Sequence, residues 1–483
     1  MSETHLEASR DASRSSADVG APQGLERRIG TLGATAMNMT QMCGIGPFIT
    51  IPTMVATLGG PQAIFGWIVG ALIVLADGLV WAELGAAMPS AGGTYVYLRE
   101  AFQYRTGRLM PFLFVWTAIL FIPLLMSTGV IGLVQYLGYL VPAVVDAEGH
   151  ANMTGHIVGI GVVGVVIAAL YRNIGEVNKL NNAFFYVMLI SVFGVIIASY
   201  SHFHSEYAFA YPEGAFKMGG SFFTGLGAAL IIAVYDYLGY NNSCYLAAEV
   251  KNPGRALPRS IVYSILGIMG LYLFLQVGVL GVLPWQEVAK SSSIASLVVE
   301  TAWGKTAANI LTGLIIITAF ASVFAGLLGG SRVPYEAARD RVFLPLFGKL
   351  HPKSHFPHIS LLILGVITAI GSLFDLTQVI AVLTAVFVLV QSVAQIVALI
   401  VLRKRQPNLH RPYRQWLYPL PCIIALAGWI YLYASAGTQP IIFSLVWLAL
   451  GIGAFMIWAK LEKIWPYGSK EIREEFVGKP ALD

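Results

Sequence analysis

The sequence predicts an all-α integral membrane protein with about twelve transmembrane helices, and three observations support this fold class. Of the 483 residues, 57% are hydrophobic and 11% are charged, whereas soluble globular chains have about 25% charged residues. The chain divides into about twelve apolar segments, each close to the roughly 20 residues that a helix needs to cross a membrane. Lysine and arginine gather in alternate loops, as they do in a chain that crosses the bilayer repeatedly.

The elements follow in a simple order along the chain. Residues 1–27 are rich in Ser, Ala and Asp and lack an apolar core. They match neither a signal peptide nor a span, so we expect a disordered cytoplasmic tail there. The predicted spans are centred near residues 45, 76, 122, 165, 190, 232, 270, 318, 365, 390, 425 and 450. Residues 28–402 hold the first ten helices, the predicted core; residues 403–464 hold helices eleven and twelve, and residues 465–483 form a cytoplasmic C-terminal tail.

The basic residues indicate which loops face the cytoplasm. Most of them lie at residues 27–28, 99–108, 172–179, 251–259, 332–353 and 403–414, whereas the intervening loops 143–156, 201–217 and 436–440 contain one lysine, Lys217. The positive-inside rule then places both termini in the cytoplasm, as an even number of spans allows. We expect a multi-pass protein of the plasma membrane, surrounded by lipid. The net charge of +5 reflects this loop bias, so no nucleic acid partner is expected.

The sequence shows no residue pattern for catalysis or for a cofactor. Cys43, Cys244 and Cys422 all fall in apolar segments, so no disulfide is expected. No Cys/His cluster has the spacing of metal ligands, and the loops contain no Ser/His/Asp constellation or phosphate-binding loop. We therefore expect neither a metal nor a cofactor, and we do not expect an enzyme.

The first span is interrupted at its middle. Residues 41–52 read QMCGIGPFITIP, with Gly44 and Gly46 one residue apart and Pro47 directly after them. Glycine costs roughly 1 kcal/mol and proline roughly 3 kcal/mol in a helix interior. A helix that only crosses the membrane gains nothing from these residues, so we expect the helix to break here.

The sixth span, residues 227–250, is interrupted as well, by Asp236, Gly239 and the pair Asn241–Asn242. The two breaks occupy corresponding positions if helices one to five and six to ten are equivalent units. Paired broken helices in corresponding positions are the best sequence indication of a secondary transporter's binding site. The pattern therefore predicts two equivalent units of five spans, with the first helix of each unit broken.

Broken helices at mid-membrane suit a binding site for physical reasons. The backbone groups that a break frees are tolerated in hydrocarbon only where they line a cavity or meet a partner. The half-helix that starts after a break presents N–H groups with a partial positive charge, and the half that ends before it presents carbonyls. Together they favour a small molecule that carries one anionic and one cationic group.

Four stretches of the sequence resemble a known family. They are CGIGPFI in the first span, WAELGAAMPSAGGTYVYLREAF at 81–102, AAEVKNPGRALPRS at 247–260 and SRVPYEAARDRVFLPLF at 331–347. In this order and spacing they resemble the amino acid–polyamine–organocation permeases, over about residues 28 to 462. The resemblance implies a twelve-helix transporter with the five-plus-five inverted repeat. It also implies that the protein moves amino acids, polyamines or related organic cations by alternating access.

The resemblance further implies a substrate site between helices one and six. The N–H groups of Gly44 and Gly46 would receive a substrate carboxylate, and carbonyls near residues 40–43 and 232–236 would receive its ammonium group. The substrate-binding residues predicted in this way are Thr40, Cys43, Gly44, Ile45, Gly46, Tyr235, Asp236, Tyr237, Gly239, Tyr240 and Asn241. Ile45 replaces a small hydroxyl residue that many family members have there, so carboxylate binding would depend on backbone donors alone.

Two substrate classes stay open. Gly-Pro-Phe at residues 46–48 and Leu-Ala-Ala-Glu-Val at residues 246–250 look more like the polyamine-uptake branch. The sixth helix of that branch carries an aspartate near the position of Asn241. A transporter of polyamines or other organic cations, with Asp236 as the amine partner, is therefore the alternative to an amino acid carrier. A nutrient sensor that binds ligand without transporting it has less support.

Asp236 and Glu83 are the acidic candidates for ion coupling. An ionisable residue inside a span is a functional candidate by default. Asp236 is either a counter-charge or protonation site, or a carboxylate that caps broken backbone. Glu83 is either a structural hydrogen-bond partner on the cytoplasmic side or part of the coupling. A proton is one candidate coupling ion, sodium held by Thr318 and Ser322 has less support, and exchange or uniport without a coupling ion stays open. Residues 141–156 lack the cysteine of relatives that pair with a glycoprotein heavy chain, so no disulfide-linked partner is expected.

Overall fold

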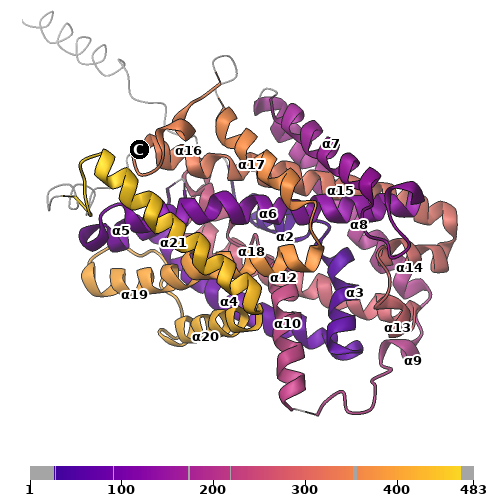
Figure 1. Cartoon of the computed structure of the whole chain (residues 1–483). Helices are drawn as coiled ribbons and strands as arrows, with labels where there is room; N and C mark the ends of the chain where they lie inside the picture. Colours follow the sequence, from indigo (N-terminus) through magenta and orange to yellow (C-terminus); the bar gives the residue numbers. More distant parts are fainter. Residues whose placement is uncertain are drawn as a thin grey trace, which may run out of the picture.

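The computed structural model describes residues 27, 29–90, 92–171, 174–217, 219–351 and 356–468, and these residues form an all-α protein without a β-strand (Figure 1). The tails predicted at residues 1–27 and 465–483 lie outside this range, apart from Arg27 and residues 465–468. The all-α prediction is confirmed for the described residues.

Eight helices in the described residues are long and apolar enough to cross a membrane. They are α4 (Ile64–Ala87), α6 (Leu109–Leu140), α7 (Met153–Leu170), α8 (Ile174–Ser201), α12 (Pro253–Val282), α15 (Lys305–Gly330), the continuous span formed by α18 and α19, and α21 (Thr438–Leu461). In that continuous span, α18 (Leu376–Phe387) passes through a π-helical segment, η5 (Val388–Ala394), into α19 (Gln395–Arg405). This tenth span extends past residue 402, where the sequence placed the end of the core.

A ninth span consists of α2 (Thr31–Met42) and α3 (Gly46–Leu58), which are bent by 50° relative to each other. Three shorter apolar helices, α10 (Gly220–Tyr237), α17 (His358–Gly371) and α20 (Leu420–Ser435), lie where the sequence places the sixth, ninth and eleventh spans. A further apolar helix, α14 (Ile294–Trp303), has 10 residues and falls far short of the roughly 20 that a crossing needs.

The remaining elements are short and connect the spans. They are α5 (Thr94–Thr106), α9 (Ser205–Ala208), α11 (Asn242–Tyr245), α13 (Trp285–Val288), α16 (Arg332–Arg339), η1 (Pro61–Ala63), η2 (Pro142–Val144), η3 (Ala247–Glu249) and η4 (Pro345–Gly348).

Helices five places apart in the order of the spans pack against each other. α3 contacts α10, α4 contacts α12, α6 contacts α15 and α7 contacts α17. These contacts pair span one with six, two with seven, three with eight and four with nine, which is consistent with the predicted five-plus-five repeat. In Figure 1, α6 runs across the middle of the molecule, α7 lies at the upper right and α20 at the lower left.

Both helix breaks lie where the sequence predicts them. α2 ends at Met42, and α3 begins at Gly46 with Pro47 in its first turn, where a proline gives up no needed donor. α10 ends at Tyr237, and the chain turns at Gly239, whose φ of 119° favours glycine. A Cβ on Gly239 would also lie 2.6 Å from Cγ of Gln41. Glycine thus lets the second break approach the first.

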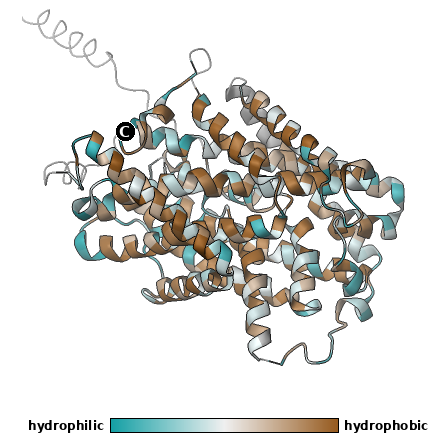
Figure 2. Cartoon of the chain, in the orientation of Figure 1, coloured by the Kyte–Doolittle hydropathy of each residue, from teal (hydrophilic) through white to brown (hydrophobic). Residues whose placement is uncertain are grey.

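The last helix faces outward. Within its most apolar stretch, 22% of α21 is buried, against 72% for α6. Its exposed side chains include Ile442, Leu450 and Ile457. Figure 2 shows brown, apolar ribbon along the helices and teal, polar ribbon mainly in the loops and at helix ends. A helix that exposes apolar side chains over this length is stable against lipid tails.

Candidate functional site

A small cavity lies where the two helix breaks meet α6 and α15. Gln41, Met42, Gly44, Ile45 and Gly46 line it from the first break, Tyr235, Asp236 and Leu238 from the second, Leu125, Met126 and Gly129 from α6, and Ser322 from α15. Its volume is about 30 Å³, which is room for one or two water molecules. Side chains must therefore move before a larger molecule can bind.

The first break presents backbone donors to this cavity. The N–H groups of Gly44, Ile45 and Gly46 donate to no acceptor among the described residues. Free N–H groups at the start of a helix carry a partial positive charge and bind anions. A Cβ on Gly44 would lie 2.9 Å from Cβ of Ser322, so only glycine lets α15 come this close.

Asp236 faces the same break from α10. The residue is 2% exposed, and a Cβ on Gly46 would overlap its oxygen Oδ1. The hydroxyl of Thr50, on α3, lies within hydrogen-bond distance of Asp236 Oδ2 and 3.0 Å from the carbonyl oxygen of Gly46. Oδ1 has no hydrogen-bond partner in the part of the chain that the structure describes. A carboxyl oxygen therefore lies beside the backbone donors of the first break.

Tyr272, on α12, joins the ends of the two broken helices. Its hydroxyl lies 2.8 Å from the carbonyl oxygen of Met42 and 3.0 Å from that of Asp236. One hydrogen is thus shared between two carbonyls that the breaks leave without a helical partner. Tyr272 is not among the site residues predicted from the sequence, although a tyrosine among aliphatic residues of a span signals a polar tip that needs a partner. Thr50 is not among them either, although it lies one helical turn after Gly46 and so shares its face.

Tyr235 is the predicted aromatic residue that does line the cavity. Its hydroxyl lies 2.6 Å from Oγ1 of Thr128 on α6, and the residue is buried. On the opposite wall, Ser322 donates its hydroxyl to the carbonyl of Ala319 at 2.9 Å, within its own helix. The hydroxyls of Tyr235 and Ser322 are therefore engaged within the protein, whereas the N–H groups of residues 44–46 and Oδ1 of Asp236 have no partner among the described residues.

The structure does not bring every predicted residue to the cavity. Tyr237 donates its hydroxyl to the carbonyl of Trp67 at 3.2 Å, and Tyr240 donates to Oδ2 of Asp77 at 2.5 Å. Both rings point from the second break into the helix packing around α4. Of the predicted residues, Gly44, Ile45, Gly46, Tyr235 and Asp236 line the cavity, whereas Thr40, Cys43, Tyr237, Gly239, Tyr240 and Asn241 lie outside its lining.

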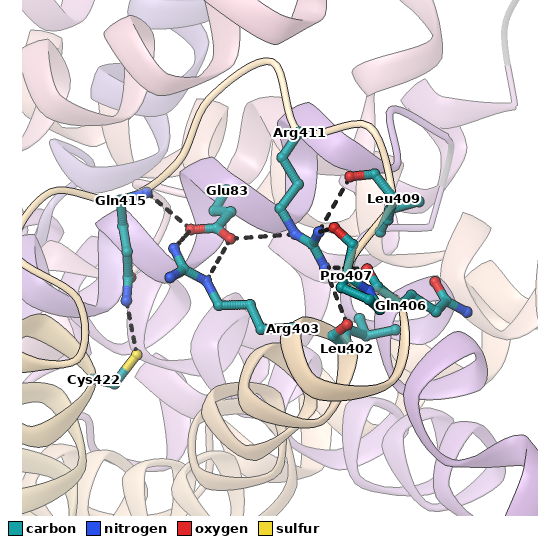
Figure 3. Close-up of polar contacts among 9 residues, drawn as sticks. All are labelled: Glu83, Leu402, Arg403, Gln406, Pro407, Leu409, Arg411, Gln415 and Cys422. Carbon is teal, nitrogen blue, oxygen red and sulfur yellow. Dashed lines mark hydrogen bonds and ion pairs between the residues drawn. The ribbon is translucent and has the colours of Figure 1, made fainter.

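Glu83 belongs to a separate polar cluster near the end of α4 (Figure 3). Arg403 donates Nε to Oε1 at 2.8 Å and Nη2 to Oε2 at 2.5 Å. The backbone N–H of Gln415 donates to Oε2 at 2.8 Å, and Nε of Arg411 lies 3.5 Å from Oε1. Glu83 is fully buried, so these partners offset the cost of burying its charge. Burial and the Glu83 charge also raise the pKa of Tyr413, in the loop before α20, to about 12.

The same cluster connects α19 and α20 to the core. Nη2 of Arg411 donates to the carbonyls of Leu402 and Gln406, at 3.1 and 3.0 Å, at the end of α19. Nε2 of Gln415 donates to Sγ of Cys422 in α20 at 3.0 Å. With every oxygen of Glu83 engaged by a donor, the geometry supports a structural role for this carboxylate over a role in ion coupling.

The sequence matches the family described as amino acid permease over residues 29–465, a range that contains all four stretches singled out in the sequence analysis. It is 28% identical over 451 residues to the branched-chain amino acid permease BcaP of Bacillus subtilis (strain 168). This alignment covers 90% of this chain and 94% of the permease. It is 26% identical over 428 residues to the serine/threonine exchanger SteT of the same organism, 85% of this chain and 91% of the exchanger. An aspartate-proton symporter of that organism is 28% identical over 326 residues, 64% of this chain and 59% of the symporter.

Proposed function

Because the chain belongs to the amino acid permease family, we propose that it carries amino acids across the plasma membrane by alternating access, with the substrate held between the two helix breaks. Two relatives that align over at least 85% of this chain are named as an amino acid permease and an amino acid exchanger. The chain is thus a membrane transporter and not an enzyme. The observation that carries the proposed binding mode is that the N–H groups of residues 44–46 have no acceptor in the part of the chain that the structure describes.

The carboxylate of the amino acid is proposed to bind at these N–H groups. Gly44, Ile45 and Gly46 supply three donors at the start of α3, and their helix adds a partial positive charge. Backbone donors in a dry site form strong hydrogen bonds to a charged acceptor. No side chain is needed for this contact, which agrees with an isoleucine at position 45.

The ammonium group is proposed to bind at the carbonyl ends of α2 and α10. The carbonyls of Met42 and Asp236 share the hydroxyl hydrogen of Tyr272. A carbonyl oxygen has two lone pairs, so each can accept a second hydrogen bond. The carboxylate and ammonium positions then lie on either side of the first break, as an α-amino acid requires.

A polyamine or another organic cation is the second candidate substrate, and one observation favours it. Oδ1 of Asp236 has no partner among the described residues, and Asp236 lines the cavity. An ionised Asp236 would attract an amine and repel a carboxylate. In that mode the N–H groups of residues 44–46 would have no ligand to bind.

We propose a proton as the coupling ion, in preference to sodium. Asp236 is the acidic side chain that lines the cavity within the described residues. The hydroxyls considered for sodium bind carbonyls of their own helix: Thr318 donates to Leu314 and Ser322 to Ala319, both at 2.9 Å. This arrangement is usual for serine and threonine in helices and needs no ion. One relative is named as a proton symporter.

Contacts between loops support cytoplasmic termini. The N–H of Ile29 donates to the carbonyl of Glu249 at 3.0 Å, and the N–H of Lys251 donates to the carbonyl of Ile29 at 2.7 Å. Arg99 pairs with Asp340 at 3.2 Å. Ile29, just before α2, therefore adjoins one basic loop, and residues of two other basic segments adjoin each other. By the positive-inside rule we propose that this side faces the cytoplasm.

The proposed function is tested by binding and transport with the purified protein. A ligand that binds only the folded state raises the melting temperature, so we would compare amino acids with their amides and their decarboxylated amines at about pH 5.5 and about pH 7.5. We expect stabilisation by an amino acid, none by its amide, and exchange of labelled amino acid in liposomes loaded with the same compound.

Other outcomes would change the assignment. Stabilisation by putrescine or spermidine alone would remove the carboxylate site and favour the organic-cation transporter. Binding of an amino acid without any exchange in liposomes would contradict transport and favour the sensor.

A further inference from the structure

The hydrogen bonds around Asp236 are satisfied most fully when its carboxyl group is protonated. Oγ1 of Thr50 lies 3.0 Å from the carbonyl oxygen of Gly46 and within hydrogen-bond distance of Asp236 Oδ2. A hydroxyl has one hydrogen, so Thr50 can make a full hydrogen bond to only one of these oxygens. A protonated Asp236 supplies the missing hydrogen: it donates to Thr50, and Thr50 donates to Gly46.

An ionised Asp236 is poorly stabilised at this position. The residue is 2% exposed, and Oδ1 has no donor within the described ranges. The titratable side chains that interact with its charge are Cys43, Tyr235, Tyr237 and Tyr272, from the two breaks and from α12. Each of these is ordinarily neutral at pH 7. A buried carboxylate without a cation or a full set of donors is unfavourable.

The other elements around Asp236 bring no charged side chain to it. α3 contains no titratable residue, and the cavity-lining residues of α6 and α15 are not titratable. No lysine, arginine or histidine interacts with Asp236 in the part of the chain that the structure describes. A proton both neutralises the carboxylate and supplies the hydrogen that the Thr50–Gly46 pair lacks.

The proton bears directly on substrate binding. This step rests on the proposed function, in which the N–H groups of Gly44, Ile45 and Gly46 receive the substrate carboxylate. Oδ1 of Asp236 lies against the Cα of Gly46, where a Cβ would overlap it, so it adjoins these donors. Two ionised carboxylates in contact repel each other, and such pairs hold a proton.

We propose that Asp236 is the proton site of the transporter and that the amino acid binds only while Asp236 is protonated. One proton then enters the site with each amino acid. Loss of that proton on the other side of the membrane leaves two carboxylates side by side, which expels the substrate. Thr50 is a positioning residue, because it accepts the hydrogen of the acid and holds Oδ1 toward Gly46.

The test measures amino acid affinity and proton uptake across a pH series with the purified full-length protein. For the wild type we expect Kd to rise about tenfold per pH unit above the pH at which Asp236 loses its proton. In that pH range, one proton should be taken up for each amino acid bound. Asp236→Asn places a neutral group of the same size at this position. Its Kd should not change with pH, and binding should take up no proton.

Asp77→Asn is the matched control. Asp77 is a second buried acid inside a span, 1% exposed, but it accepts from Tyr240 and lies outside the cavity lining. This variant should keep the pH dependence of the wild type. If Asp236→Asn fails to fold, Asp236→Ser is a second neutral variant, and the same flat profile is expected of it.

Two results would overturn the proposal: a wild-type Kd that does not change with pH, or a pH dependence that survives in the neutral Asp236 variants. Thr50→Val should keep the tenfold slope but move the pH at which it begins, and Thr50→Ser should restore that pH. A merely structural threonine would change the melting temperature without moving the profile. Failure of the wild type to bind any amino acid at any pH would count against the proposed function. This result differs from the two results above, in which the protein binds an amino acid but Asp236 does not control the binding.

Discussion

Gly46 and Asp236 are in contact across the two helix breaks, so closely that a methyl group on Cα of Gly46 would overlap Oδ1 of Asp236. One residue starts α3 and the other belongs to the last turn of α10. The contact therefore joins the two halves of the core at the cavity. It brings the donors that suit a substrate carboxylate next to the acid that we assign to the proton.

Replacement of Gly46 by alanine should damage the site. The added methyl group has no space, and overpacking of this kind costs about 1–3 kcal/mol. A displaced Asp236 and a shifted start of α3 should weaken amino acid binding by about tenfold or more, since each 1.4 kcal/mol is a factor of about ten. The Kd of Gly46→Ala for an amino acid measures the loss of binding, and its melting temperature measures the cost of overpacking.

The control for this variant is Gly313→Ala. Gly313 lies within α15, and a Cβ there would meet nothing within 4 Å. An alanine at such a helical position stabilises by about 0.4–1 kcal/mol. The affinity of Gly313→Ala should equal that of the wild type. If Gly46→Ala also bound with wild-type affinity, the contact between Gly46 and Asp236 would be unimportant for binding.

Replacement of Tyr272 by phenylalanine should destabilise the protein and leave its lipid-facing surface unchanged. The variant removes the hydroxyl that serves the carbonyls of Met42 and Asp236. A buried acceptor left without a donor costs about 1–3 kcal/mol. Tyr263→Phe is the matched control, because Tyr263 is on the same helix and is 56% exposed. Equal melting temperatures for the two variants would refute the bridging role.

Truncation of Arg403 should affect stability much more than substrate affinity. Arg403→Ala leaves the fully buried carboxylate of Glu83 without its closest cation, and removal of one partner of a buried ion pair costs about 3–5 kcal/mol. Lys404→Ala is the control, because Lys404 follows Arg403 in the chain and is exposed. This variant should change neither the stability nor the substrate affinity. If Arg403→Ala instead abolished the pH dependence of binding at unchanged stability, Glu83 would belong to the coupling machinery.

A methyl group at Gly129 should shift selectivity toward smaller amino acids. Gly129 lines the cavity from α6, and its Cβ would lie 2.8 Å from Cγ2 of Val323 and 3.5 Å from Oγ of Ser322. One methylene in an apolar pocket is worth about 1–3 kcal/mol. We expect the ratio of the Kd of leucine to that of alanine to rise by about tenfold in Gly129→Ala. The same ratio in Gly164→Ala, on α7 with nothing within 4 Å, should stay at its wild-type value.

The positions of both breaks could be predicted from the sequence because glycine and proline act locally. Gly46 and Pro47 start α3, and Gly239 supplies the turn after α10, through constraints on their own backbone. The prominence of Asp236 was predictable for a similar reason, since a single acid in an apolar segment is unfavourable wherever its helix packs.

The partners of these residues could not be predicted, because they come from distant segments. Thr50 lies 186 residues from Asp236, and Tyr272 lies 230 residues from Met42. The direction of Tyr240 was also out of reach, since this residue follows the end of α10, where the regular 3.6-residue period no longer assigns side chains to faces. Tyr237 is the last residue of α10, and its partner, the carbonyl of Trp67, is again a distant residue. Both tyrosines therefore looked like site residues although they pack away from the cavity.

The single hydroxyl of Tyr272 has a consequence for how tightly the membrane is sealed. α2 and α10 end at carbonyls that bind the same atom, at 2.8 and 3.0 Å. A motion that separates these ends must break at least one hydrogen bond, each worth about 0.5–1.5 kcal/mol net. α2 and α10 are thus more stable when they move together as one body. This coupling opposes opening of the site to both sides of the membrane at the same time. A carrier that opened on both faces at once would leak protons and dissipate the gradient that drives it.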